Sequence, residues 1–153
     1  MSSSNSKKFL QDPEARKQIM LDHYECPRNF CSDNKCPAGY QSGNTNSPSC
    51  IDNVTAYVLV KDNKVKDIKF GGESCTICKS STDIMASTLV GKTVEEALDF
   101  IKNYMNMIDH KEFNDAILDE LIVFDNIWRQ SNRVNCAKTG INAIKKALEK
   151  YVK

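Results

Sequence analysis

A repeated alternation of apolar and polar residues constrains the fold of this chain more than any other feature. Val54, Ala56, Val58 and Val60 occupy every second position of one stretch, and residues 65–70 resume the same period of two after the tetrapeptide KDNK. Successive side chains of a strand point to opposite faces of a sheet, and a short segment containing Asp and Asn suits a tight turn. The sequence therefore predicts a β-hairpin.

Before the hairpin, the sequence predicts one helix and one irregular segment. Asp12 is suited to cap a helix that begins with Pro13, and the partial apolar stripe that follows ends before Pro27, so this helix is expected over about residues 13–25. Residues 27–49 are rich in Pro, Gly, Asn and Ser, and we expect a short strand and a mobile loop there.

After the hairpin, the pattern is helical. Thr93 and Glu96 form a capping box, and Gly91 is suited to end the preceding helix. Helices are expected over residues 76–90, from Thr93 through Met105, near 114–128, and from about Cys136 to the end of the chain. The predicted fold class is therefore α+β, a small three-stranded antiparallel β-sheet packed against about five α-helices. We expect a flexible N-terminus over residues 1–10 and a single domain over residues 11–153.

Charge and composition exclude several classes of partner. The formal net charge of +1 gives no field that would attract nucleic acid or an anionic membrane. No stretch approaches the roughly 20 apolar residues of a membrane span, and the first residues lack the apolar region of a signal peptide, so we expect a cytoplasmic protein. The seven cysteines are then expected to stay reduced, which favours metal binding or sulfur chemistry over disulfides.

Three cysteines fall at junctions between predicted elements. Cys50 lies at the entrance of the hairpin, Cys75 at its exit, and Cys136 at the predicted start of the last helix. The two ends of a hairpin lie together, so Cys50 and Cys75 are expected to meet across about 5 Å, and a helix N-terminus favours thiolate. With the carboxylate of Asp52 they form a four-ligand set that suits zinc. The competing interpretation is three small buried side chains and a turn-forming Asp.

Four stretches resemble a known family, the U-type iron–sulfur assembly proteins, which comprise IscU, the N-terminal part of NifU, and SufU. The matching stretches are MLDHYECPRNF at residues 20–30, SPSCID at 47–52, FGGESCTICKSS at 70–81 and RVNCA at 133–137. They occur in the family's order and cover most of the chain.

Within this family the sequence resembles SufU more than IscU. The region between Cys75 and Cys136 includes the segment DHKEFNDAILDELIVF, which SufU-like members carry and IscU lacks, and Asn135 stands where IscU has His. The chain also departs from most SufU-like members, which usually have Lys at position 135 and Pro at the position of Ser131.

The resemblance implies a zinc-dependent sulfurtransferase. It implies a tightly bound Zn²⁺ held by Cys50, Asp52, Cys75 and Cys136, and a PLP-dependent cysteine desulfurase of the SufS type as partner, ahead of the downstream iron–sulfur assembly machinery. In this mechanism a desulfurase histidine displaces Cys50 from the metal, Cys50 accepts persulfide sulfur, and Asp52 is the labile ligand. Arg133 is implied as a supporting cation that offsets the anionic ligands.

Two further functions stay open at this stage. The same four residues are able to hold iron or a [2Fe–2S] cluster, which would make the chain a scaffold on which a cluster is assembled and passed on. Alternatively, zinc stabilises the fold of a binding module that has no sulfur chemistry.

The other cysteines and His23 receive no functional assignment. CTIC suggests a redox pair, but we interpret Cys78 as a helix-packing residue. His23, Cys26, Cys31 and Cys36 are of the types that bind zinc, yet their spacing matches no common site.

Overall fold

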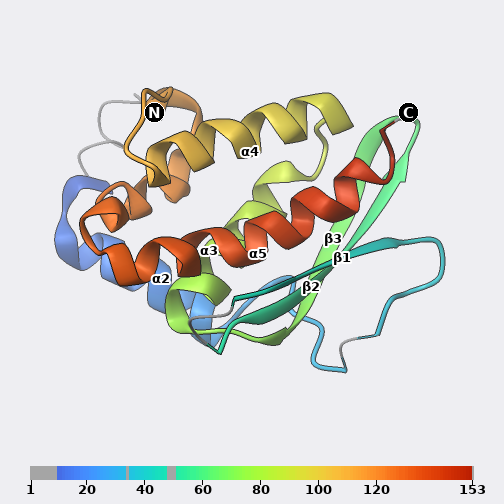
Figure 1. Ribbon diagram of the computed structural model, residues 1–153, viewed down its shortest axis with the longest axis horizontal. Helices are drawn as coiled ribbons and strands as arrows, with labels where there is room; N and C mark the ends of the chain where they lie inside the picture. Colours follow the sequence, from blue (N-terminus) through green and yellow to red (C-terminus); the bar gives the residue numbers. More distant parts are fainter. Residues whose placement is uncertain (1–9, 34, 48–50, 153) are drawn as a thin grey trace.

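A computed structural model describes residues 10–33, 35–47 and 51–152, and these form a three-stranded sheet covered by helices (Figure 1). The sheet and the surrounding helices agree with the α+β class predicted from the sequence. The elements are α2 (Pro13–Glu25), β1 (Gln41–Asn46), β2 (Asn53–Lys61), β3 (Lys64–Glu73), α3 (Thr76–Leu89), α4 (Val94–Ile108), the 3₁₀ helices η1 (Asp115–Ile117), η2 (Asp119–Phe124) and η3 (Ile127–Arg129), and α5 (Ser131–Glu149).

The predicted hairpin is formed by β2 and β3. The strands are antiparallel, with Val58 opposite Ile68, and they are joined by Asp62 and Asn63. These two residues have φ angles of 53° and 61°, the left-handed conformation that a two-residue hairpin turn requires and that Asp and Asn tolerate. The third strand, β1, lies in the segment where a short strand was expected and pairs antiparallel with β2.

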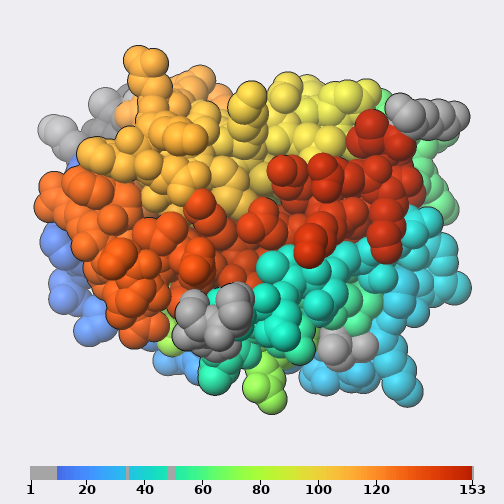
Figure 2. All heavy atoms as spheres, viewed as in Figure 1, coloured from blue at the N-terminus to red at the C-terminus, as the bar shows by residue number. Residues whose placement is uncertain are grey.

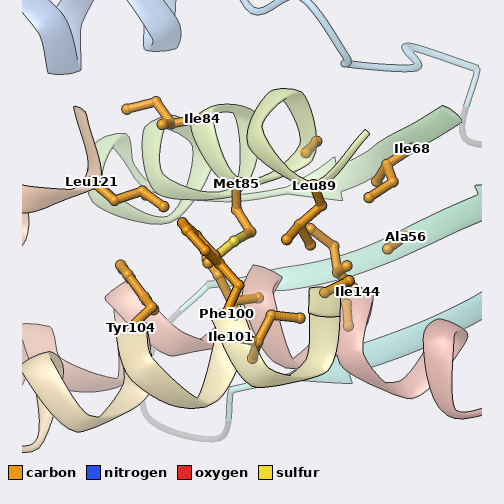
Figure 3. Close-up of a cluster of buried hydrophobic side chains, with 14 of the residues drawn as sticks. Ala56, Ile68, Ile84, Met85, Leu89, Phe100, Ile101, Tyr104, Leu121 and Ile144 are labelled. Carbon is orange, nitrogen blue, oxygen red and sulfur yellow. The ribbon is translucent and has the colours of Figure 1, made fainter. Parts of the chain in front are cut away.

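The helices form two layers, one directly on the sheet and one packed on the first. Helix α5 lies against β1 and β2, and α3 lies against β3. Helix α4 packs on α5, and α4, α5 and β1 share one face of the molecule (Figure 2). The core between these elements is apolar: α3 contributes Met85 and Leu89, α4 contributes Ile101, and each is almost fully buried (Figure 3).

The helix starts agree with most of the capping signals in the sequence. Asp12 caps α2, which begins at Pro13 as predicted. Thr93 and Glu96 form the predicted capping box at the start of α4. Gly91 follows the end of α3 with a φ of 94°, which a residue with a side chain adopts only with strain.

Two predictions about helices are wrong, one about the type of helix and one about where a helix begins. Residues 114–128 form three 3₁₀ helices instead of an α-helix, because the buried side chains Leu118, Leu121, Phe124 and Ile127 recur every three residues, the period of a 3₁₀ helix. The last helix begins at Ser131 and not at about Cys136. Its first turn is exposed and polar, so the apolar stripe that located the helix in the sequence begins only in the second turn.

Two further expectations from the sequence were a flexible N-terminus and the lack of a membrane span. Of the N-terminus predicted to be flexible, residues 1–9 lie outside the described part of the chain. Within the described residues, the structure contains no helix with the length and apolar character that a membrane span needs.

The contact between β1 and α5 depends on Gly43. A Cβ atom at this position would lie 2.5 Å from the carbonyl oxygen of Ala143 and 2.7 Å from the amide nitrogen of Ala147, both on the backbone of α5. The next residue of β1, Asn44, accepts a hydrogen bond at its carbonyl oxygen from the Nζ of Lys146 on α5 at 3.0 Å. Glycine therefore permits α5 to lie directly on the edge strand.

We predict that Gly43→Ala lowers the free energy of unfolding by about 2 kcal/mol or more, because β1 and α5 have to move apart. Urea denaturation followed by circular dichroism measures this change. Asn46→Ala, at an exposed position of the same strand, is the matched control and is expected to leave the midpoint nearly unchanged. Equal midpoints for the two variants would contradict the role given to Gly43.

Candidate metal centre

Asp52 joins the two ends of the hairpin. It precedes β2 and is fully buried, and its Oδ1 accepts a hydrogen bond from the backbone N–H of Cys75 at 2.7 Å. Its carbonyl oxygen accepts a second hydrogen bond from the N–H of Ser47 at 2.8 Å. Asp52 therefore connects the end of β1, the start of β2 and the exit of β3, as expected from an antiparallel hairpin with both ends at one edge.

Cys75 is the N-cap residue of α3. Its Sγ accepts a hydrogen bond from the N–H of Cys78 at 3.4 Å, and its thiol donates to Oδ2 of Asp52 at 3.7 Å. A sulfur in this position faces the positive end of the helix dipole, which favours a negative charge there. The prediction that Cys75 lies at a helix N-terminus is confirmed.

Cys136 reaches the same place from a different part of its helix. It lies in the second turn of α5, beyond the first turn where the helix dipole acts, so the sequence-based argument that a helix N-terminus favours its thiolate is wrong. The residue is buried, with 2% of its surface exposed. Its position is set instead by the packing of α5 against α3 and the sheet.

Asp52, Cys75 and Cys136 form a cluster of potential ligands. One carboxylate oxygen and the two Sγ atoms all lie within 4.8 Å of one another, and the described residues contain no other such group of three His, Cys, Asp or Glu side chains. Ligands of a tetrahedral zinc ion with bonds of about 2.3 Å lie roughly 3.7 Å apart, so small adjustments suffice. Two sulfurs and one oxygen are donor types that zinc accepts, and the cluster therefore fits this metal.

The structure does not test the predicted roles of two further site residues, Cys50 and Arg133. Cys50 lies outside the described residues, so its place as the fourth ligand stays a prediction. Arg133 is exposed on α5, three residues before Cys136 and on the same side of the helix. Its supporting role also stays a prediction.

Cys78 is a packing residue in this structure. Its side chain is fully buried in the apolar core. Burial, together with the negative charges of Asp52 and Cys75, raises the pKa of the Cys78 thiol far above its usual value. A thiol held in its neutral form is a poor ligand and a poor nucleophile, which agrees with the sequence-based interpretation.

His23 forms a buried ion pair that the sequence did not indicate. Its Nδ1 donates to Oδ2 of Asp83 at 2.6 Å, and its Nε2 lies 3.4 Å from Oε1 of Glu120. The other oxygen of Asp83 accepts hydrogen bonds from the N–H groups of Arg28 and Asn29. The run of polar residues 79–83 between the apolar residues of α3 was the signal that could have revealed this network, since Ser80, Ser81, Thr82 and Asp83 are fully buried.

The other cysteines do not form a second metal site in the described part of the chain. Cys26 and Cys36 are exposed, and Cys31 is half-buried. The thiol of Cys31 donates to Oδ1 of Asp33 at 3.3 Å, and the thiol of Cys36 lies near backbone carbonyl oxygens. None of them joins His23 in a group of ligands.

Comparison with known proteins identifies the family. The model of the NifU-like N-terminal domain matches residues 15–153. The zinc-dependent sulfurtransferase SufU of Bacillus subtilis is 30% identical over 135 residues, which cover 88% of this chain and 89% of that protein. The iron–sulfur cluster assembly scaffold protein IscU of Thermotoga maritima is 32% identical over 102 residues, covering 67% of this chain and 72% of that protein.

A solved structure shows the same fold. The crystal structure of the SUF-system protein FiSufU from Fervidobacterium islandicum AW-1 has a TM-score of 0.73 and 30% sequence identity. The match covers 86% of this chain and 94% of that one.

We predict that Cys75→Ala removes tight zinc binding and that Cys78→Ala does not, although the two residues are three positions apart. Changing a group that merely hydrogen-bonds to a ligand costs about 10- to 100-fold in metal affinity, so loss of a direct ligand is expected to cost more than about 100-fold. Competition with a chromophoric chelator measures the affinity. Tight binding by the Cys75 variant would remove this residue from the site.

The stability of the protein is predicted to fall at alkaline pH. Burial lowers the pKa of His23, but the hydrogen bonds to Asp83 and Glu120 and the charge of Asp83 outweigh burial and the repulsion of Arg28, raising this pKa to about 9. A raised pKa adds stability that is complete below about pH 6.5 and is lost as the pH rises through 9.

The expected loss between these pH values is about 2 kcal/mol or more. Urea denaturation at pH 6, 7.5 and 9.5 measures it, with His23→Gln as the comparison. The variant is expected to be less stable at pH 6 and to show a flatter profile. Parallel profiles for the two proteins would exclude His23 as the source.

Proposed function

The chain belongs to the NifU-like N-terminal domain family, which contains iron–sulfur cluster assembly proteins such as SufU and IscU, and we propose that it is a zinc-dependent sulfur acceptor within iron–sulfur cluster assembly. Its sulfur donor would be a PLP-dependent cysteine desulfurase of the SufS type. Its acceptors would be the downstream assembly proteins.

One observation carries the proposal. The carboxylate of Asp52 and the thiols of Cys75 and Cys136 converge within 4.8 Å at the mouth of the hairpin, and Cys50 is only two residues from Asp52 in the sequence. Cys50, Asp52, Cys75 and Cys136 would hold the metal. Bound zinc would supply electrostatic stabilisation that keeps the coordinated thiols deprotonated.

The four proposed ligands have different roles at this metal. Asp52 is held by the Cys75 N–H through Oδ1, which leaves Oδ2 facing the Cys75 sulfur. Cys75 and Cys136 come from helices packed into the core, so they are suited to stay in place. Cys50 lies in the connection between β1 and β2, and it is the ligand proposed to exchange.

The proposed transfer is a thiol–persulfide exchange. The Cys50 thiolate attacks the outer sulfur of the desulfurase persulfide, and a new S–S bond forms. The S–S bond to the desulfurase cysteine breaks, and that cysteine leaves as a thiolate with the electron pair. Sulfane sulfur is thereby moved to Cys50 without any external oxidant or reductant.

A cluster scaffold is the second candidate function. IscU of Thermotoga maritima is named as an assembly scaffold, and the same thiols and carboxylate are able to ligate a [2Fe–2S] cluster. Anaerobic purification followed by metal analysis and a visible spectrum separates the two candidates. Zinc without visible bands supports sulfur transfer, whereas a coloured protein containing iron and sulfide supports the scaffold. Zinc without any effect on a desulfurase would favour a zinc-stabilised binding module.

The role of Asp52 provides the sharpest test of sulfur transfer. We predict that Asp52→Ala keeps substantial zinc, because three thiolates still bind the metal. The variant is expected to lose most of its stimulation of a SufS-type desulfurase, because the labile oxygen ligand that is proposed to assist ligand exchange is gone. The experiment measures bound zinc and the production of alanine from cysteine in the same samples. Asp99→Ala, at an exposed position of α4, is the matched control and is expected to behave as wild type.

Each outcome of this experiment has a definite meaning. Loss of zinc and stimulation in strict proportion would show that Asp52 only retains the metal. Normal stimulation with zinc bound would show that Asp52 has no part in ligand exchange. A wild-type protein that carries zinc but never accepts sulfur at Cys50 would refute the proposed function itself.

A further inference from the structure

Residues 109–120, which follow α4 and include η1 and the first two residues of η2, are exposed along nearly their whole length. We call this segment the acidic arch. Leu118 is the only buried residue in it. The arch follows the end of α4 on the side of the molecule where η2 packs against α2 and α3 (Figure 1). It lies in the region of the sequence between Cys75 and Cys136.

The arch is held by polar contacts. The side chain of Asn103 on α4 donates to the carbonyl oxygen of Asn114 at 2.8 Å and accepts from its N–H at 2.7 Å. The side chain of Asn114 in turn accepts from the N–H of Ala116 at 3.1 Å. Leu118 anchors the far end in the core. These contacts tie the arch to α4 and to the core.

Two large apolar side chains stand exposed on the arch. Phe113 is 36% exposed and Ile117 is 44% exposed, on either side of the segment pinned by Asn114. Exposing large apolar side chains to water is unfavourable, so two of them on one segment are candidate contacts for another protein. The arch thus has apolar anchor points.

The charges around these anchors are negative. Glu112, Asp115 and Asp119 are exposed, and within the described residues none of them lies within 4.0 Å of a basic group. The carboxylate of Asp109 is paired with Lys138, and that of Glu120 with His23. In the described part of the chain, the arch therefore carries three carboxylates without a basic partner and one lysine, Lys111, in the same stretch as the apolar pair.

We propose that the acidic arch is a docking surface for a positively charged protein segment that carries apolar side chains. Lysine or arginine residues of the partner would pair with the free carboxylates, and its apolar residues would cover Phe113 and Ile117. An acidic segment would be repelled by the same carboxylates, as would the phosphates of nucleic acid or of an anionic membrane. The proposal does not require any metal or sulfur chemistry.

A peptide titration of the intact protein tests this surface. The probe is a synthetic amphipathic helical peptide of about 16 residues with leucines on one face and lysines on the other. It is titrated into ¹⁵N-labelled protein at low ionic strength. The expected result is a set of chemical-shift changes that centres on residues 111–119.

Paired variants separate the apolar and the charged contributions. Phe113→Ser with Ile117→Ser, and separately Glu112→Lys with Asp115→Lys, are each expected to weaken binding by about tenfold or more. The matched controls are Val152→Ser and Glu149→Lys, which change an exposed apolar residue and an exposed carboxylate elsewhere. Both controls are expected to bind as wild type. All substituted positions are exposed, and thermal unfolding checks that each variant is folded.

Several results would overturn the proposal. These are a lack of peptide binding by the wild-type protein, shift changes centred on another surface, and equal affinities for the arch variants and their controls. Equally tight binding of a peptide with glutamate in place of lysine would also overturn it, because the recognition would then not depend on charge.

Discussion

The hydrogen bond from the Cys75 N–H to the Asp52 carboxylate is the contact on which the candidate centre depends. Asp52 is fully buried and Cys75 is half-buried, and the bond between them links the entrance of the hairpin to its exit. It also fixes the backbone at the point where β3 ends and α3 begins, so the Cys75 sulfur takes its position as N-cap. A single charge-assisted bond thereby orients two potential metal ligands at once.

The third ligand depends on a different constraint, which is the close approach of α5 to the sheet. Gly43 lets the helix backbone lie directly on β1, and Gly140 makes room for the side chain of Thr82 on α3, which a Cβ there would overlap. Gly140 lies one turn after Cys136 on α5. Because both contacts leave no room for even one more carbon atom, small shifts of α5 are not easily absorbed, and Cys136 is held close to Asp52 and Cys75.

The sequence predicted the parts of this arrangement that local chemistry decides. The hairpin, its Asp-Asn turn and the caps at Asp12 and Thr93 follow from residue types at short spacing, and so does the meeting of the two hairpin ends. The positions of three cysteines and Asp52 at the junctions of predicted elements pointed to one ligand set, and the resemblance to SufU and IscU pointed to the same set. Both kinds of inference agree on Asp52, Cys75 and Cys136.

Contacts between distant segments were beyond the sequence. The buried pair of His23 and Asp83 joins residues 60 positions apart, and no local pattern identifies its partners. The start of α5 was missed because its first turn faces solvent, and the 3₁₀ region was missed because its period of three resembles a weak helical stripe. In each case tertiary packing decided the outcome.

The distribution of charge connects the two proposals about this protein. The acidic arch carries three carboxylates that have no basic partner among the described residues, and a centre of three thiolates and one carboxylate around Zn²⁺ would have a formal charge of about −2. The net charge of the whole chain is nevertheless +1, so the basic residues are in excess elsewhere.

A partner that meets both regions would need positive groups at two separate places. The His23 network connects the arch to α3, since His23 contacts both Glu120 at the end of the arch and Asp83 on the helix that Cys75 caps. This polar connection ties the end of the arch to α3. Docking at the arch would therefore present the metal centre to the partner in a reproducible orientation.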